Sequence, residues 1–364
     1  MNLKDCCVLI PSLEPNEKLP NYVKKLLEGG FGQIIVIDDG SGAEYQPIFE
    51  DIASWDRCTV LHHPVNYGKG HALKTGFSHI LENTSFGGVI TADSDGQHTL
   101  PDARHLAEIL QADREDLLIG SRDFSLKSTQ VPARSRFGNR CTSVVFKLLY
   151  GRWLPDTQTG LRGISRKLLP DCLHIEGERF EYEMNQLMYC ATHHIPMQVV
   201  PIETVYEQDN NEKSHFDTIK DSWRIYKLIF GNFFRFAGSS ILSWIVDQGL
   251  YNLLFYVLLT GALAAQDTRS IVATIAARIL SATVNYSLNR KFVFKSGEGV
   301  GKTVLRYFVL ALGILALSAG LTALLGHIIP NWLAKVLIDL CLYLVSYRVQ
   351  KAWVFADSKE DASK

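Results

Sequence analysis

Two aspartates stand two residues apart in the segment Asp93-Ser94-Asp95-Gly96-Gln97-His98. The segment directly follows Val89–Thr91, an apolar run with the composition of a buried strand. Paired carboxylates at a strand end can hold a hard divalent cation through oxygen ligands, and Gln97 can add a further oxygen. Such a cation can neutralise the charge of a departing diphosphate. An ordinary solvated turn is the alternative for this segment taken alone.

Two further polar segments border apolar or helical patterns in the N-terminal half. Asp38 and Asp39 follow the run Ile34–Ile37, where a carboxylate can reach a ribose or a base. The segment Asn66–Ala72 precedes a helical pattern, so its glycines permit close approach to a phosphate and Lys69 supplies a positive charge. Each segment alone is also typical of a turn or a helix start. Their order along one half of the chain favours a nucleotide site.

Short apolar runs alternate with helical patterns through this half, and the alternation positions the polar segments. Strands are predicted at residues 6–10, 34–37, 60–62, 89–91 and 117–119, and helices at 19–27, 71–81 and 140–153. Continuous apolar runs bounded by turn formers are typical of buried parallel strands. The pattern predicts a mostly parallel α/β sheet that binds its ligands at the carboxyl ends of the strands.

The second half of the chain differs in composition. Residues 1–230 mix charged and apolar residues, whereas long apolar segments occupy residues 236–259, 270–289, 307–326 and 332–351. Each is close to the roughly 20 residues that a helix needs to cross a bilayer. We therefore predict a soluble domain over 1–230, a membrane domain of four helices over 231–357 and a polar tail over 358–364. A soluble protein with four buried helices is the alternative.

Basic residues predict the orientation of the membrane domain. The loop between the second and third apolar segments carries five of them, whereas the other two loops carry only Arg269. Because cytoplasmic loops are rich in Lys and Arg, this loop and both termini are predicted to be cytoplasmic. The sequence shows no signal peptide, and its seven scattered cysteines form no C-x-x-C pair, which agrees with a reducing compartment. We expect a multi-pass protein of the plasma membrane.

Two charged residues, Asp247 and Arg278, fall near the middle of adjacent apolar segments. An unpaired charge at such a depth is costly. One reading is that the two residues pair and hold two helices together. The other is that Arg278 lends its charge to a lipid-linked phosphate.

The ordered motifs of the first half resemble those of family 2 glycosyltransferases of the GT-A fold, in the branch similar to dolichol-phosphate-mannose synthase. The matching segments lie at residues 8–11, 37–41, 66–72, 93–98, 120–122, 156–160, 180–183 and 213–216. The resemblance implies inverting, metal-dependent transfer of a hexose from a UDP- or GDP-linked sugar to polyprenyl (undecaprenyl) phosphate. The product would be a lipid-linked sugar for cell-envelope glycosylation.

The resemblance also implies roles for particular residues. Mg²⁺ or Mn²⁺ would be held by Asp93, Asp95 and Gln97. The nucleotide-sugar would be bound by Pro11, Glu14, Asp38, Asp39, Lys69, Asp93 and Lys213. The catalytic set, including the arginines that would meet the acceptor phosphate, would be Asp95, Arg122, Arg134 and Arg136. The chain departs from the family at one position: it has Pro15 where the family usually has a glutamate.

Residues 234–355 resemble the GtrA-like family of four-helix membrane proteins, which is associated with polyprenyl-linked sugars. The matching segments are Phe234–Gly238, Asn285–Phe294 and Tyr347–Phe355. The expected partners are therefore a nucleotide-sugar, polyprenyl phosphate and membrane lipid. A net charge of −1 gives no reason to expect nucleic acid.

Three other functions compete with this interpretation. A GtrA-type translocation or scaffold protein with a degenerate transferase domain is disfavoured by the intact Asp93, Asp95 and Arg122. A processive polysaccharide synthase usually carries Gln-x-x-Arg-Trp, which this sequence lacks. Nucleotidyl transfer needs a different glycine-rich motif near the N-terminus. The sequence leaves open the sugar, the nucleotide, the polymer finally decorated and whether the chain forms a homo-oligomer.

Overall fold

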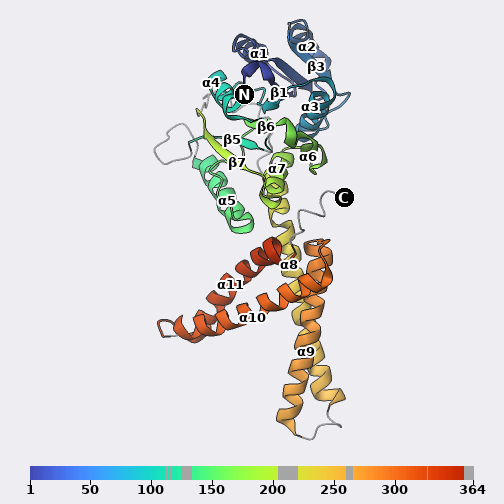
Figure 1. Cartoon of the computed structure of the whole chain (residues 1–364), viewed down its shortest axis with the longest axis vertical. Helices are drawn as coiled ribbons and strands as arrows, with labels where there is room; N and C mark the ends of the chain where they lie inside the picture. Colours follow the sequence, from blue (N-terminus) through green and yellow to red (C-terminus); the bar gives the residue numbers. More distant parts are fainter. Residues whose placement is uncertain are drawn as a thin grey trace. The chain divides into compact units, whose positions relative to one another are not determined.

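The computed structural model describes residues 1–111, 114, 116–123, 133–203, 220–259, 265–325 and 327–355. The chain divides into two compact units, Met1–Leu228 and Ile229–Lys364 (Figure 1). We call the first the sheet unit and the second the helical unit.

A seven-stranded sheet forms the centre of the sheet unit (Figure 1). Its strands are β1 (Cys6–Ser12), β2 (Gln33–Asp38), β3 (Cys58–His62), β4 (Gly88–Thr91), β5 (Leu117–Ser121), β6 (Arg162–Ser165) and β7 (Met197–Pro201). They lie in the order β3-β2-β1-β4-β6-β5-β7, and only the pairings of β6 are antiparallel. The predicted mostly parallel α/β sheet is confirmed, and each predicted strand is present and longer than predicted.

Among the described residues of the sheet unit, the strands are accompanied by seven α-helices: α1 (Lys18–Glu28), α2 (Gln46–Ala53), α3 (Lys69–Asn83), α4 (Leu100–Ile109), α5 (Ala133–Tyr150), α6 (Leu169–His174) and α7 (Glu181–Thr192). In α1, Leu19, Val23 and Leu26 recur at helical spacing and are fully buried in the core beside β1 and β2. Both strands are buried along almost their whole length, which explains their continuous apolar sequence. The predicted helix at 140–153 begins earlier and ends earlier, as α5.

Strands β6 and β7 are absent from the sequence-based prediction. β6 has only four residues, and its first, Arg162, is fully buried. The Arg162 guanidinium donates to the carbonyl oxygens of Thr159 and Glu183 and to Oε1 of Gln186. A short strand that starts with a buried arginine lacks the apolar run that predicts β1 to β5.

The described part of the helical unit consists mainly of four long helices: α8 (Lys220–Leu253), which begins in the sheet unit, α9 (Gln266–Leu288), α10 (Val300–Leu325) and α11 (Asn331–Val349). Among the described residues, three segments are long and apolar enough to cross a membrane: Phe233–Leu258, Gln266–Val293 and Val300–Leu325. Large apolar side chains of α10 point outward, and Leu312 is 67% exposed. Such a surface suits a helix that faces lipid.

The fourth predicted crossing corresponds to α11, which is not among those three segments. Its Lys335 and Asp339 form an ion pair one helical turn apart, with Nζ 2.7 Å from Oδ2. The Ser318 hydroxyl of α10 donates to the same Asp339 carboxylate. Four helices are present, but the number of crossings and their orientation stay predictions.

The predicted pairing of Asp247 with Arg278 is confirmed. An Arg278 Nη2 lies 3.4 Å from Asp247 Oδ2, and the Ser281 hydroxyl donates to Asp247 Oδ1 at 2.9 Å. Asp247 is buried and belongs to α8, whereas its two partners belong to α9. The pair therefore joins these two helices.

The ends of α9 and α11 resemble each other in sequence and in structure. Asn285–Phe294 (NYSLNRKFVF) aligns with Ser346–Phe355 (SYRVQKAWVF), with tyrosine, amide, basic residue and Val-Phe at matching positions. In both, the amide begins a π-helical turn, at Asn289–Val293 and at Gln350–Val354. The hairpins α8–α9 and α10–α11 are therefore similar units.

Contacts between aromatic rings also connect equivalent positions of the two aligned segments, Asn285–Phe294 and Ser346–Phe355. Phe294 stacks on its equivalent, Phe355, with ring centroids 5.2 Å apart. Phe294 also contacts Tyr347 at 5.8 Å, and Phe355 contacts Tyr286 at 5.7 Å. Tyr286 and Tyr347 are themselves equivalent, so each hairpin makes the same contact with the other. From these reciprocal contacts we infer a local pseudo-two-fold axis between Phe294 and Phe355.

The equivalent amides meet on this axis. Asn289 is fully buried, and its Nδ2 donates to Gln350 Oε1 at 3.0 Å and to Asn285 Oδ1 at 2.8 Å. Its Oδ1 accepts a hydrogen bond from the Ser239 hydroxyl of α8. One side chain thus connects α8, α9 and the turn after α11.

We expect Asn289→Ala to lower the free energy of unfolding of the helical unit by about 1–3 kcal/mol, because buried partners lose their hydrogen bonds. Thermal unfolding of the purified protein in detergent measures the change. Asn252→Ala is the matched control, since exposed Asn252 donates only to a carbonyl of its own helix. Equal melting temperatures for both variants would contradict the assigned role of Asn289.

Candidate active site

The polar segments meet at one edge of the sheet because parallel strands point their carboxyl ends the same way. Asp38 ends β2, Asp93 follows β4 and Arg122 follows β5. β6 runs in the opposite direction, so the loop before it, Asp156–Leu161, reaches the same edge. Glu203, which follows β7, also lies there.

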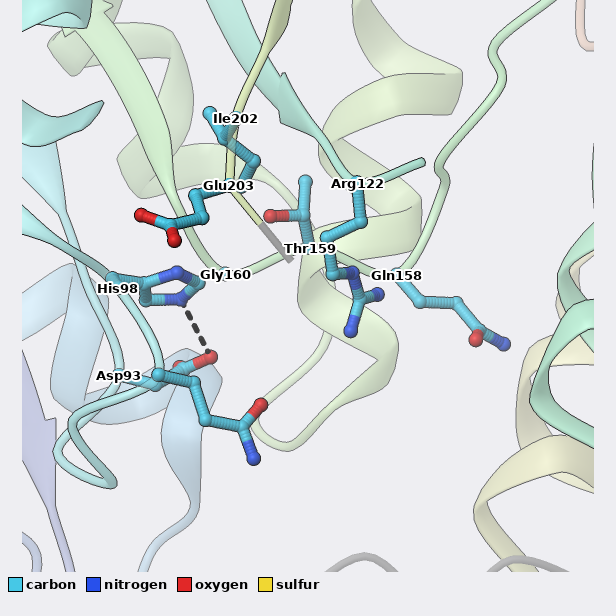
Figure 2. Close-up of a pocket in the computed structure, with 9 residues that line it drawn as sticks. Asp93, His98, Arg122, Gln158, Thr159, Gly160, Ile202 and Glu203 are labelled. Atoms are coloured by element: carbon cyan, nitrogen blue, oxygen red, sulfur yellow. Dashed lines mark hydrogen bonds and ion pairs between the residues drawn. The ribbon is translucent and has the colours of Figure 1, made fainter. Parts of the chain in front are cut away.

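A pocket at this edge is lined by Asp93, Gln97, His98, Arg122, Gln158, Thr159, Gly160, Ile202 and Glu203. These residues come from four loops, each next to a different strand. Figure 2 shows the side chains of Asp93, His98, Arg122 and Glu203 around a common space. The pocket therefore presents carboxylates and a guanidinium to one ligand.

Asp93 carries two strong internal contacts. Lys69 Nζ lies 2.7 Å from its Oδ1, and His98 Nε2 lies 3.2 Å from its Oδ2 (Figure 2). Burial alone would raise the pKa of Asp93, but the Lys69 ammonium and the His98 ring outweigh burial and hold that pKa well below its usual range. Asp93 is therefore ionised at neutral pH. The buried His98 thus positions this carboxylate.

Asp95 belongs to the turn after β4 and is not among the residues that line the pocket. Its Oδ1 accepts a hydrogen bond from the backbone N–H of Gln97 at 2.9 Å, and Asp95 is exposed. Gly96, between them, has φ = +76°, a conformation that favours glycine. The turn keeps the two aspartates at one strand end.

Lys69 lies between two carboxylates. It begins α3, and its Nζ is 3.0 Å from Glu183 Oε2 on α7 as well as 2.7 Å from Asp93. Burial alone would lower the pKa of Lys69, but the charges of Asp93 and Glu183 raise it above its usual value. Glu183 is not among the site residues that the sequence predicts. Its pairing with Lys69 spans 114 positions and leaves no local pattern.

The glycines around Lys69 let the start of α7 come close. A Cβ atom at Gly68 would lie 2.5 Å from the carbonyl oxygen of Glu178, and one at Gly70 would lie 2.5 Å from Cβ of Tyr182. Gly68 also has φ = +110°. The structure shows that these glycines pack against the start of α7, and the phosphate contact predicted for this segment stays a prediction. The glycines thereby bring Lys69 within reach of Glu183.

Asp38 and Asp39 use their carboxylates within the protein. Asp38 accepts from Ser41 N–H at 2.8 Å and Gln46 Nε2 at 3.1 Å, and it pairs with His62. Burial would raise its pKa, but these hydrogen bonds outweigh burial and lower it. Asp39 accepts from the N–H groups of residues 67 and 68 and pairs with His63. Both aspartates shape loops at the sheet edge, and their contact with a nucleotide stays a prediction.

Arg122 is held by a buried partner. Its Nε and Nη2 donate to the two oxygens of Asp156 at 2.8 and 3.2 Å, and Asp156 is fully buried. Such a two-point contact fixes the plane of the guanidinium. Arg122 therefore enters the pocket in a defined orientation.

Gly160 makes room for the Asp93 carboxylate. A Cβ atom at Gly160 would overlap both carboxylate oxygens of Asp93. The Gly160 carbonyl also accepts a hydrogen bond from the Thr91 hydroxyl at 2.8 Å. The loop before β6 thus forms a wall that contacts the Asp93 carboxylate. The sequence of this loop, Thr157–Gly160, does not predict that contact.

The other predicted site residues are placed less centrally. Pro11 is buried within β1, opposite Ile37 of β2. Glu14 follows β1 with φ = +48°, and its N–H donates to the Ser41 hydroxyl. Arg136 lies partly buried on α5 and is not among the residues that line the pocket. Lys213 and the side chain of Arg134 lie outside the described residues.

The residues at this strand end fit a divalent cation that takes some of its ligands from the protein and the others from a bound substrate. Among the described residues, no three His, Cys, Asp or Glu side chains form a complete metal cluster. Mg²⁺ commonly binds one or two carboxylates plus substrate phosphates, so a two-aspartate site suits it. A cation already touches Asp93, namely the Lys69 ammonium. The Asp93 carboxylate is therefore ionised and lies where a positive charge can bind to it.

Comparison with known proteins agrees with these observations. Residues 7–173 match the family model of glycosyl transferase family 2, and residues 235–355 match that of the GtrA/DPMS transmembrane domain. An uncharacterized protein of Methanocaldococcus jannaschii is 28% identical over 214 residues, which cover 57% of this chain and 84% of that protein.

Two of the relatives have names that state both an activity and an acceptor. The UDP-N-acetylglucosamine–dolichyl-phosphate N-acetylglucosaminyltransferase of Methanococcus voltae is 25% identical, with 55% of this chain and 86% of that protein covered. A dolichyl-phosphate beta-glucosyltransferase of Trichomonas vaginalis is 24% identical, with 44% and 53% covered. The chain thus carries a domain of glycosyl transferase family 2 followed by a GtrA/DPMS transmembrane domain.

Proposed function

We propose that this enzyme transfers a hexose from a nucleotide-sugar to polyprenyl phosphate, with Mg²⁺ or Mn²⁺ held by Asp93 and Asp95. The observation that carries the proposal is one pocket lined by both the Asp93 carboxylate and the Arg122 guanidinium. The carboxylate suits the cation of a nucleotide diphosphate, and the guanidinium suits a phosphate. The metal-bound nucleotide-sugar and the acceptor phosphate must react with each other, so the carboxylate and the guanidinium that would bind them must lie side by side.

The relatives support the acceptor more strongly than the donor. The two named enzymes differ in the sugar, N-acetylglucosamine or glucose, but both names specify dolichyl phosphate. A phosphate on a polyprenyl chain is thus their common feature. A transmembrane domain on the same chain agrees with an acceptor that resides in lipid.

The proposed chemistry is a single displacement. The second pKa of a phosphate monoester is about 6, so the acceptor is largely a dianion at neutral pH. Its oxygen attacks the anomeric carbon as the bond from that carbon to the diphosphate breaks. The nucleoside diphosphate leaves, and the configuration inverts. No proton has to be removed, so the site needs no strong general base.

The protein's task is to hold and neutralise charge. When bound, a divalent cation offsets the negative charge that develops on the departing diphosphate. Asp93 and Asp95 would hold that cation, with Gln97 beside them. Arg122, oriented by Asp156, would bind the acceptor phosphate. Arg134 and Arg136 are proposed as further acceptor contacts, and Pro11, Glu14, Asp38, Asp39, Lys69 and Lys213 as donor contacts.

The division of the chain also belongs to the proposal. The transferase would occupy residues 1–230 and the membrane domain 231–357, with a tail over 358–364. The transferase and both termini would face the cytoplasm, where nucleotide-sugars are made.

The direct test is transfer by the purified protein. It is incubated with undecaprenyl phosphate and a panel of labelled UDP- and GDP-sugars, with Mn²⁺, Mg²⁺ or EDTA. One labelled sugar should enter the lipid phase, and EDTA should stop it. Label that reaches no lipid with any donor overturns the proposal.

We expect Asp95→Asn to reduce turnover at least roughly 100-fold with little change in melting temperature. Loss of even an outer partner of a metal ligand costs about 10–100-fold, and Asp95 is proposed as a ligand itself. Steady-state transfer at saturating Mn²⁺ measures the effect. Asp56→Asn, an exposed aspartate at the amino end of β3, is the control. Turnover like that of the wild type would remove Asp95 from the metal site.

We expect Arg122→Ala to raise the KM for the lipid acceptor roughly 10- to 100-fold, because a charge-assisted hydrogen bond is worth about 1.5–3 kcal/mol. The KM for the nucleotide-sugar should change much less. Arg114→Ala, an exposed arginine at the amino end of β5, controls for loss of charge. If only the donor KM rises, the arginine serves the donor.

We expect Gly160→Ala to raise the Mn²⁺ concentration for half-maximal transfer by roughly 10-fold. The added methyl group displaces the Asp93 carboxylate, a flexible side-chain end, so the melting temperature should change little. Gly138→Ala on α5 is the control, because a Cβ atom there meets nothing within 4 Å. An unchanged Mn²⁺ requirement would show that this wall does not position Asp93.

A further inference from the structure

The Lys69 ammonium forms an ion pair with Asp93, the carboxylate that is proposed to bind the metal. Its Nζ lies 2.7 Å from Asp93 Oδ1 and 3.0 Å from Glu183 Oε2, and its side chain is only 16% exposed. A cation so close to Asp93 competes with any second cation for the same charge, since like charges a few ångströms apart repel strongly. Lys69 and a divalent ion therefore cannot both neutralise Asp93 fully.

We propose that Lys69 is a displaceable counter-ion of the metal site. With no donor bound, its ammonium neutralises Asp93 and disfavours a lone divalent cation. When the cation arrives with the nucleotide-sugar, Lys69 releases Asp93, remains held by Glu183 and pairs with the donor diphosphate. Lys69 and Glu183 thereby couple metal binding to donor binding. This inference rests on the proposed function.

The protein holds the lysine in place from its backbone. The N–H groups of Tyr67 and Gly68 donate to Asp39, at 3.1 and 2.7 Å. Lys69 is the first residue of α3, so the start of the helix sets the direction of its side chain.

The second carboxylate is fixed just as firmly. Glu183 is buried on α7, and the buried guanidinium of Arg162 donates to its carbonyl oxygen at 2.7 Å. Gly70 packs against Tyr182, the residue before Glu183, and joins α3 to α7 at this point. Glu183 can therefore keep the ammonium near the pocket after Asp93 has exchanged it for a metal.

The test measures Mn²⁺ binding to the full-length protein in detergent, without nucleotide, from the electron paramagnetic resonance signal of free Mn²⁺. Lys69→Met should bind Mn²⁺ roughly 10-fold more tightly than the wild type, because the competing cation is gone; couplings between ligands commonly span about 5- to 150-fold. The same variant should have a higher KM for the nucleotide-sugar. If Lys69 had only a structural role, the variant would instead bind Mn²⁺ more weakly than the wild type and would also have the higher KM for the nucleotide-sugar.

Glu183→Gln should act in the opposite sense. With the glutamate neutral, the ammonium binds Asp93 alone, so Mn²⁺ binding weakens. This loss should shrink in the double variant with Lys69→Met, since no ammonium remains to be transferred. Lys74→Met is the control for charge, because Lys74 also lies on α3 but pairs with Glu178, at 2.9 Å. It should leave Mn²⁺ affinity unchanged.

Asp93→Asn separates this inference from the proposed function. If Asp93→Asn binds Mn²⁺ as the wild type does, the proposed metal site itself is wrong. If it loses Mn²⁺ binding while Lys69→Met binds like the wild type or more weakly, the metal site stands and the counter-ion role is overturned. Tighter Mn²⁺ binding by Lys69→Met with Lys74→Met unchanged supports the proposal.

Discussion

The pairing of the Asp93 carboxylate with positive and polar groups is the interaction on which the site depends. Lys69 comes from α3, His98 from the turn after β4, and Gly160 from the loop before β6. Three separate parts of the chain must therefore reach one strand end. The parallel sheet supplies that convergence, and antiparallel β6 supplies the loop that closes it. Without β6 in this direction, Gly160 would lie at the opposite edge.

The sequence predicts the sheet and the site to different extents. Buried parallel strands appear as continuous apolar runs, so β1, β2 and β4 could be recognised, together with the aspartates at the carboxyl ends of β2 and β4. Contacts between distant side chains have no such signal. The Lys69–Glu183 pair and the wall at Gly160 depend on how α7 and β6 pack, and β6 begins with a buried arginine. The motifs could thus be located, whereas the partners of each motif required coordinates.

The helical unit shows the same division. Long apolar segments predict its helices, and the cost of an unpaired charge in lipid predicts that Asp247 meets Arg278. The pseudo-two-fold relation between its hairpins rests on a few shared positions, such as Tyr286 with Tyr347 and Phe294 with Phe355. Helices that are apolar on every side offer no periodic pattern to mark an interface. The buried amide of Asn289 is a better marker, because a polar group there must find a partner.

The charges of the site explain how it can be stable when empty and still bind anions. Buried charges without partners are costly, and this pocket needs both carboxylates and cations. In the structure, Lys69 is neutralised by Asp93 and Glu183, and Arg122 by Asp156. Each pair is internal, so neither cation depends on a substrate for its neutralisation. A phosphate or a metal can then bind by exchanging one partner of an existing pair, which leaves less charge uncompensated than binding to isolated groups would. The pairing that stabilises the fold thereby also prepares the pocket for charged ligands.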